Sequence, residues 1–283
     1  MGPAIYPITP SFVAEVGDVD LSKPLSASEL GAVRNAFWKY AVLIFPEQDL
    51  TPEQHLAFSQ YFGPVEADRV LDARVTPHRL GAAFADISNL APDGKIWAED
   101  SRQRMYKAGN RLWHTDSSFK YRPGLCSLLY SRTVAPVGGH TEFADQRAAY
   151  DALPDAMKKK LDGVIAEHSI ATSRRKTGFS NFSDDESKRL PPVPQLLVRT
   201  IPESGRKSLY LASHAGRIIG MADAGRPRAY RGAHRAHHSA PVRVHASLAA
   251  QRSGDVGQPL HDASRDRFRR PALGARHASH DGE

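Results

Sequence analysis

The amino-acid pattern changes at Met221, and this change limits which part of the chain can fold. The 62 residues after Met221 hold 13 Ala, 11 Arg and 7 of the 13 His, with no Lys, Ile or Trp. They show neither helical nor alternating apolar spacing, so they cannot bury enough apolar surface to offset their ordering entropy. We therefore expect a folded domain over residues 1–221 and an aberrant, disordered Arg/Ala/His-rich tail over residues 222–283.

Most of the formal charge of +7 belongs to this tail. Its 11 Arg and 6 acidic residues give a charge of +5, which leaves only +2 for the rest of the chain. A non-enzymatic binding protein with a basic arm is therefore an alternative reading. The tail has no Lys, one Phe and one Tyr, however, and so lacks the aromatic side chains that stack on bases. We expect no nucleic-acid partner.

The remaining composition is that of an ordinary globular chain. A length of 283 residues is enough for one large domain with a core. No apolar run reaches the length of a membrane span, and the first residues lack a signal-peptide pattern. Cys126 is the only cysteine, so no internal disulfide can form. We expect a cytoplasmic protein with no membrane partner, and a homo-oligomer is allowed.

Local patterns within residues 1–221 predict both helices and strands. Ser26 with Glu29, and Thr51 with Pro52 behind it, have the spacing of helix starts. Residues 145–161 carry helical spacing that is interrupted at Pro154. Short apolar or alternating runs predict strands at residues 40–45, 112–119, 125–134, 196–200 and 208–211. The last two are predicted to form a hairpin.

The central motif is Asn-Arg-Leu-Trp-His-Thr-Asp-Ser-Ser-Phe at residues 110–119. Alternate side chains of a strand share a face, so His114 and Asp116 would point in the same direction. An imidazole and a carboxylate are two of the three ligands of a 2-His-1-carboxylate site, which binds Fe(II) and leaves positions open for a co-substrate and O2. A bare His-x-Asp pair is also common on protein surfaces, so the surrounding sequence has to support this interpretation.

The surrounding sequence closely resembles the taurine dioxygenase family of Fe(II)- and 2-oxoglutarate-dependent enzymes, and most of all its 2,4-dichlorophenoxyacetate branch. Besides the central motif, the similar segments are residues 63–65, 85–89, 136–154 and 204–207. The resemblance covers roughly residues 5–221, and the order and spacing of its motifs are specific. It implies a mainly β fold with flanking helices, a double-stranded β-helix (jelly roll) that is incomplete here at the C-terminus.

The same resemblance implies a set of site residues. His114 and Asp116 would hold iron, and the Thr141 hydroxyl would donate to the carboxylate of 2-oxoglutarate. The residues implied to face the substrate are Asn110, Lys95 and His214. Without the resemblance, Thr141 reads as an ordinary strand threonine and Asn110 as a turn former. Lys95 then reads as a surface lysine in a loop, and His214 as a polar histidine with its hydrogen bonds satisfied.

The implied activity is hydroxylation of a small carboxylate or aryloxy substrate, with Fe(II), 2-oxoglutarate and O2. A 2,4-dichlorophenoxyacetate-like compound is the first choice, another aryloxy or carboxylate compound the second, and a sulfonate such as taurine the third. A member of the family that binds metal without turnover is a further alternative.

The family pattern also requires a distal His, in a stretch like Val-Met-Trp-Asp-Asn-x-x-x-x-His-Arg, and an Arg about ten residues later. Such an Arg pairs with the far carboxylate of 2-oxoglutarate. No tail histidine, His234 and His261 included, stands in that context. The chain as given is therefore expected to be inactive.

The genetic code offers an explanation for the missing motif. Codons can be chosen for residues 254–264 that, read one nucleotide later, encode Val-Met-Trp-Asp-Asn-Arg-Cys-Thr-Met-His-Arg. The same shift also produces family-like segments from residues 222–226, 239–248 and 275–281. One extra nucleotide after Met221 would account for all four, so we interpret the tail as translated out of frame.

Overall fold

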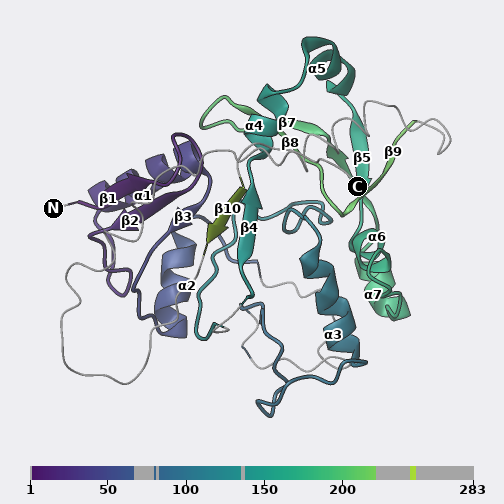
Figure 1. Cartoon of the computed structure of the whole chain (residues 1–283), viewed down its shortest axis with the longest axis horizontal. Helices are drawn as coiled ribbons and strands as arrows, with labels where there is room; N and C mark the ends of the chain where they lie inside the picture. The colour runs from purple at the N-terminus through teal and green to yellow at the C-terminus, as the bar shows by residue number, and fades with distance from the viewer. Residues whose placement is uncertain (1, 67–79, 81–82, 135–137, 221–242, 247–283) are drawn as a thin grey trace, which may run out of the picture. The chain divides into compact units, whose positions relative to one another are not determined.

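The fold was analysed in a computed structural model, which describes residues 2–66, 80, 83–134, 138–220 and 243–246 (Figure 1). Seven α-helices and ten strands lie within these residues. No helix in these ranges is long and apolar enough to cross a membrane.

The N-terminal part combines a small sheet with two helices. Strands β1 (Ala4–Pro7) and β2 (Ala14–Gly17) are antiparallel, and β3 (Leu43–Ile44) pairs with β2 in parallel. Helices α1 (Ala27–Tyr40) and α2 (Pro52–Gln60) follow β2 and β3 in the chain. The predicted strand at residues 40–45 is thus reduced to the two residues of β3, which lie opposite Ala14 and Glu15 of β2.

Both predicted helix starts are confirmed. The Ser26 side chain accepts a hydrogen bond from the Glu29 backbone amide, and the Glu29 carboxylate accepts one from the Ser26 amide. Thr51 and Gln54 form the same reciprocal pair at α2. These caps satisfy amide groups that have no partner within the helix. The apolar residues of this region form a core that includes Val16, Leu21, Val33, Leu50 and Phe58.

The helical pattern at residues 145–161 is also confirmed, including its interruption at Pro154. Helix α4 (Gln146–Asp151) precedes that proline and α5 (Asp155–Leu161) follows it. The break is expected because proline disfavours the helical conformation in the residue before it. The elements between α5 and the end of the domain are β5 (Ile165–His168), α6 (Ile170–Arg175), α7 (Asp184–Arg189), β6 (Val193–Leu196), β7 (Val198–Thr200), β8 (Lys207–Leu209) and β9 (Ala215–Ile218).

These later strands form two small sheets. One has the order β6-β5-β9 and is antiparallel throughout, and the other is the antiparallel pair β7-β8. The hairpin predicted from residues 196–200 and 208–211 is confirmed by the β7-β8 pair. A second core lies here, and its fully buried residues include Ala166, Leu197, Leu209 and Leu211.

The strands predicted at residues 112–119 and 125–134 are wrong. Neither segment contains a strand; residues 112–119 are loop and turn, and Ser117 has a φ of 54°. Residues 125–130 nevertheless alternate in exposure, with Leu125 and Leu129 exposed and Leu128 packed on the N-terminal core. Alternation therefore gave the inward and outward faces correctly, but a strand also requires a neighbour with which its backbone can pair.

One short strand lies within the tail. Strand β10 (Arg243–Ala246) pairs antiparallel with β4 (Thr141–Ala144), with Ala246 opposite Thr141 (Figure 1). Four residues of the segment expected to be disordered thus have a backbone partner. Every other residue from 221 to 283 lies outside the described ranges, and these include His234 and His261. The boundary between the domain and the tail at Met221 therefore stays a prediction.

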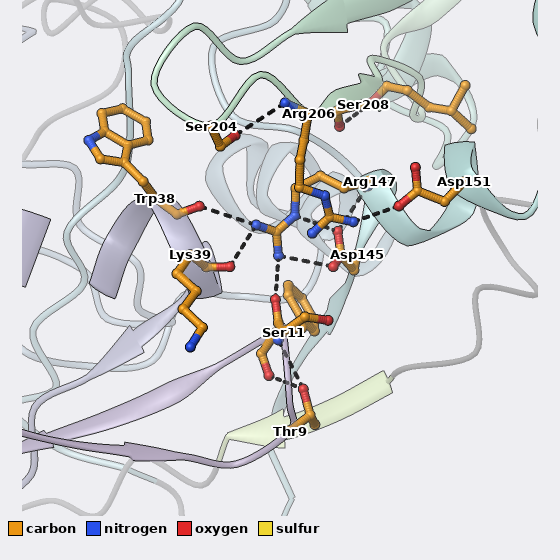
Figure 2. A network of polar contacts seen from close by, with 12 residues as sticks. Thr9, Ser11, Trp38, Lys39, Asp145, Arg147, Asp151, Ser204, Arg206 and Ser208 are labelled. Carbon is orange, nitrogen blue, oxygen red and sulfur yellow. Dashed lines mark hydrogen bonds and ion pairs between the residues drawn. The ribbon is translucent and has the colours of Figure 1, made fainter. Parts of the chain in front are cut away.

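A buried ion pair fixes the end of β4, as Figure 2 shows. Arg147 donates to both carboxylate oxygens of Asp145, and also to the backbone carbonyls of Ser11 at 2.9 Å and Lys39 at 3.0 Å. The two charged side chains are only 3% and 2% exposed. A buried guanidinium is tolerated where its donors are all used in this way. The contacts fasten β4, which begins at Thr141, to the N-terminal part of the chain.

Candidate metal and substrate site

His114 and Asp116 lie side by side in a loop. The His114 Nε2 atom is 3.2 Å from Asp116 Oδ1. The sequence suggested that a strand brings them together, but both residues lie outside any strand, and a turn begins at Asp116. The two groups raise each other's preference for the charged form: Asp116 raises the pKa of His114, and His114 lowers that of Asp116.

Neighbouring groups fix the orientation of both side chains. The His114 Nδ1 atom lies 2.7 Å from the Leu112 carbonyl, so Nδ1 carries a hydrogen and donates it. Asp116 Oδ2 accepts a hydrogen bond from the Ser127 hydroxyl at 2.7 Å. The atoms that remain available to bind a metal ion are therefore His114 Nε2 and Asp116 Oδ1. Such contacts behind a metal ligand are typical of metal sites in proteins.

This pair of atoms fits a metal ion. Two metal bonds of about 2.1 Å at a right angle would separate their ligand atoms by about 3 Å. The observed separation of 3.2 Å is close to that value. Within the described part of the chain, however, no third His, Cys, Asp or Glu completes a metal-binding group with them.

His214 lies beside this pair. Its ring centroid is 6.1 Å from that of His114 and 4.9 Å from that of Phe119. It is 2% exposed, and its Nδ1 has no hydrogen-bond partner among the residues described. Burial, together with the charge of Arg174, lowers the pKa of His214 to about 3, so this ring is neutral at ordinary pH.

The structure brings only some of the predicted site residues together. Asn110 lies on the short 3-10 helix η1 (Ala108–Arg111), which leads directly to His114. Lys95 is 84% exposed in a turn beside Asp93. Neither Lys95 nor Thr141 makes a hydrogen bond or ion pair with another predicted site residue in the ranges that the structure describes.

Sequence reasoning did not identify Ser127, Arg174 or His168 as neighbours of the site. Ser127 and Arg174 contact it from 11 and 64 residues away in the sequence. His168 stacks on Tyr210, with ring centroids 5.4 Å apart and an interplanar angle of 13°. None of the three stands in a motif of its own, so no local signal was present to find them.

His168 makes the stability of the fold depend on pH. Burial, with a contribution from Arg199, lowers the pKa of His168 from its ordinary value of 6.5 to about 4. The unfolded chain therefore takes up a proton here below about pH 6.5, whereas the folded chain does so only near pH 4. The stabilisation is complete above pH 6.5 and is lost as the pH falls from 6.5 to 4, at a cost of up to about 3 kcal/mol.

We expect a His168→Gln variant to lose less stability between pH 7 and pH 4.5 than the unaltered chain. Urea unfolding at several pH values measures the difference. A His140→Gln variant, which changes an exposed histidine, is the matched control and should keep the original pH dependence. Equal pH dependence in all three proteins would show that His168 does not titrate as its burial requires.

Comparison with known proteins shows which family and which enzymes the chain is similar to. The sequence profile described as "Taurine catabolism dioxygenase TauD, TfdA family" matches residues 4–256. The alpha-ketoglutarate-dependent 2,4-dichlorophenoxyacetate dioxygenase of Cupriavidus pinatubonensis is 39% identical over 216 residues, which are 76% of this chain and 75% of that protein. The (S)-phenoxypropionate/alpha-ketoglutarate-dioxygenase of Sphingobium herbicidovorans is 37% identical over 78% of this chain and 75% of its own length.

A solved structure agrees in fold. The crystal structure of AAD-2 in complex with Mn(II) and N-oxalylglycine superimposes with a TM-score of 0.84 and 42% sequence identity. The superposition covers 88% of this chain and 87% of the other.

Proposed function

The chain belongs to the TauD, TfdA family of dioxygenases, and we propose that it hydroxylates a small aryloxy carboxylate similar to 2,4-dichlorophenoxyacetate. Its class is that of the 2-oxoglutarate-dependent dioxygenases, which use Fe(II), 2-oxoglutarate and O2. The observation that carries the proposal is the 3.2 Å approach of His114 Nε2 to Asp116 Oδ1, in a chain whose relatives act on phenoxy compounds. A sulfonate such as taurine is the alternative substrate.

His114 and Asp116 would hold the iron through Nε2 and Oδ1. Fe(II), when bound, supplies the redox chemistry by which O2 converts 2-oxoglutarate to succinate and CO2 while one oxygen atom enters the substrate. The Leu112 carbonyl and the Ser127 hydroxyl keep the two ligand atoms pointing at one place. Thr141 would donate a hydrogen bond to the carboxylate of 2-oxoglutarate.

Lys95 and His214 would face the substrate carboxylate, and Asn110 would line the substrate pocket. Because the buried His214 is neutral, it would act as a hydrogen-bond partner and not as a positive charge. Lys95 is exposed, so its ammonium group is free to move toward a bound anion. Charge complementarity then favours a carboxylate over an uncharged substrate.

The proposal also covers the fold, the origin of the tail, the location of the protein and its partners. A jelly roll would be built from residues 1–221, with its late strands replaced by the out-of-frame residues 222–283. The match to the Cupriavidus protein spans 216 residues, which is about the length of residues 1–221 and supports this part of the proposal. A cytoplasmic location, a homo-oligomer and the absence of nucleic-acid and membrane partners are also proposed.

The function is tested with the frame-corrected protein, made by deleting one nucleotide after codon 221. We expect it to release succinate from 2-oxoglutarate when Fe(II) and an aryloxyacetate are both present, and to do so less with taurine. Succinate is measured directly, and reactions without Fe(II) or without substrate are the controls. Failure to turn over with every aryloxyacetate and sulfonate would overturn the assignment.

A further inference from the structure

Arg174 is a buried cation in contact with the candidate site. It lies on α6, is 5% exposed, and its guanidinium carbon is 4.4 Å from the centroid of the Tyr106 ring. On another side it fills the space next to Gly109, where an added Cβ would lie 2.2 Å from Nη1. Only glycine at position 109 therefore lets the guanidinium reach η1, the turn that leads to His114.

The burial of Arg174 is not explained by a gain in the stability of the fold. No carboxylate lies within ion-pair distance of Arg174 in the part of the chain that the structure describes, and its buried Nε has no hydrogen-bond partner there. A buried charge without a counter-ion is costly, and the contact with the Tyr106 ring offsets only part of that cost. Departures of this kind from good packing occur at functional sites.

Outside its own helix, Arg174 contacts the Tyr106 side chain and the Asn110 amide. Arg174 Nη2 donates to Asn110 Oδ1 at 3.0 Å. A guanidinium can only donate, so the oxygen of the amide must face Arg174 and its NH2 group must face away. Asn110 is exposed, and its Nδ2 makes no hydrogen bond with any described residue. A free donor thus stands on the turn that precedes His114, with a positive charge behind it.

We propose that Arg174 is a positioning residue that sets the preference of the site for an anionic substrate. It holds the Asn110 amide so that the NH2 group donates to the carboxylate of the substrate, and its buried charge polarises that donor. This inference rests on the proposed function in taking the substrate to be an aryloxy carboxylate. It adds a residue from α6, 64 positions away in the sequence, to the recognition of that carboxylate.

A purely structural role for Arg174 would give a different result. If the side chain only supported η1, its loss would weaken the binding of charged and uncharged ligands alike. A role in charge recognition changes only the binding of the charged one. A pair of ligands that differ in charge but hardly in shape therefore separates the two roles.

The experiment measures the binding of phenoxyacetate and of uncharged phenoxyacetamide to the full chain by calorimetry. We expect Arg174→Met to weaken phenoxyacetate binding about tenfold, the effect of losing support for one charge-assisted hydrogen bond, and phenoxyacetamide binding less than about twofold. Arg174→Lys keeps the charge and should fall between. Arg175→Met, which changes the exposed arginine next to it, is the matched control and should alter neither.

Asn110→Ala tests whether Arg174 acts through the amide. In that background Arg174→Met should weaken phenoxyacetate binding by less than about twofold, because coupled residues are not additive. A full tenfold further loss would overturn the route through Asn110. If Arg174→Met does not fold, as judged by its melting temperature, the same comparison is made with Arg174→Lys and an expected loss of about threefold.

Equal losses for both ligands, no loss, or no phenoxyacetate binding by the unaltered chain would each overturn the inference. These outcomes are separate from failure of the proposed function, which is read from succinate release. Turnover without a selective effect of Arg174 would remove only the inference. Selective binding without turnover would remove only the proposed activity.

Discussion

Replacing His114 or Asp116 by Ala is expected to abolish the activity of the frame-corrected protein. Each change removes one of the three proposed iron ligands, and metal affinity depends on the number and geometry of the ligands. Changes to groups that merely orient a ligand cost 10 to 100-fold, so loss of a ligand should lower affinity or turnover by at least about 100-fold. Fe(II) binding under anaerobic conditions and succinate release measure the two effects separately.

Two control variants make this test specific. Ser127→Ala removes the hydrogen bond to Asp116 Oδ2 but keeps both ligands, so it should cause a smaller loss of about tenfold. Asp155→Ala removes a carboxylate that is 94% exposed and should change nothing. Retained activity in either ligand variant would mean that the metal is bound elsewhere. Metal binding without turnover in the frame-corrected protein would instead identify a member of the family that has lost its activity.

Deleting one nucleotide after codon 221 is expected to convert an inactive chain into an active one. The shifted frame would supply a distal His as the third ligand and an Arg for the far carboxylate of 2-oxoglutarate. A bidentate Arg–carboxylate pair both orients and binds a co-substrate. Without these groups we expect no detectable turnover. With them, turnover should be at least about 100-fold above the detection limit, the same factor that we expect for the loss of one metal ligand.

The two forms are compared side by side by succinate release and limited proteolysis. The given chain should be cleaved rapidly beyond Met221, because late strands that fail to bury the inner face of a sheet leave its edges open. The corrected chain should resist the same protease. A given chain that resists protease to its end and turns over 2-oxoglutarate would disprove the frame shift. The nucleotide sequence at codon 221 is an independent check.

Strand β10 pairs with β4 although it lies in the segment that we interpret as translated out of frame. Its contact with β4 is a ladder of backbone hydrogen bonds, which do not depend on the identity of the side chains. A third metal ligand, in contrast, depends on one particular side chain at one position. The pairing of residues 243–246 therefore does not by itself supply the groups that catalysis needs.

The sequence determined those features that depend on neighbouring residues. Both helix starts, the break at Pro154 and the β7-β8 hairpin were predicted and are present, because each is set by contacts within a few residues. The proximity of His114 and Asp116 also follows from their spacing, although the loop that brings them together was not foreseen. Family membership followed from the order of motifs, which needs no structure.

Only the tertiary structure decided which segments pair and which charges are buried. Residues 112–119 and 125–134 alternate like strands but lack a paired neighbour, and pairing is a property of the whole fold. Arg174 reaches Asn110 across 64 residues through the gap beside Gly109, and nothing in the sequence near either residue indicates it. Burial likewise makes His168 and His214 neutral, because desolvation depends on what the folded chain places around a group and not on its neighbours in sequence.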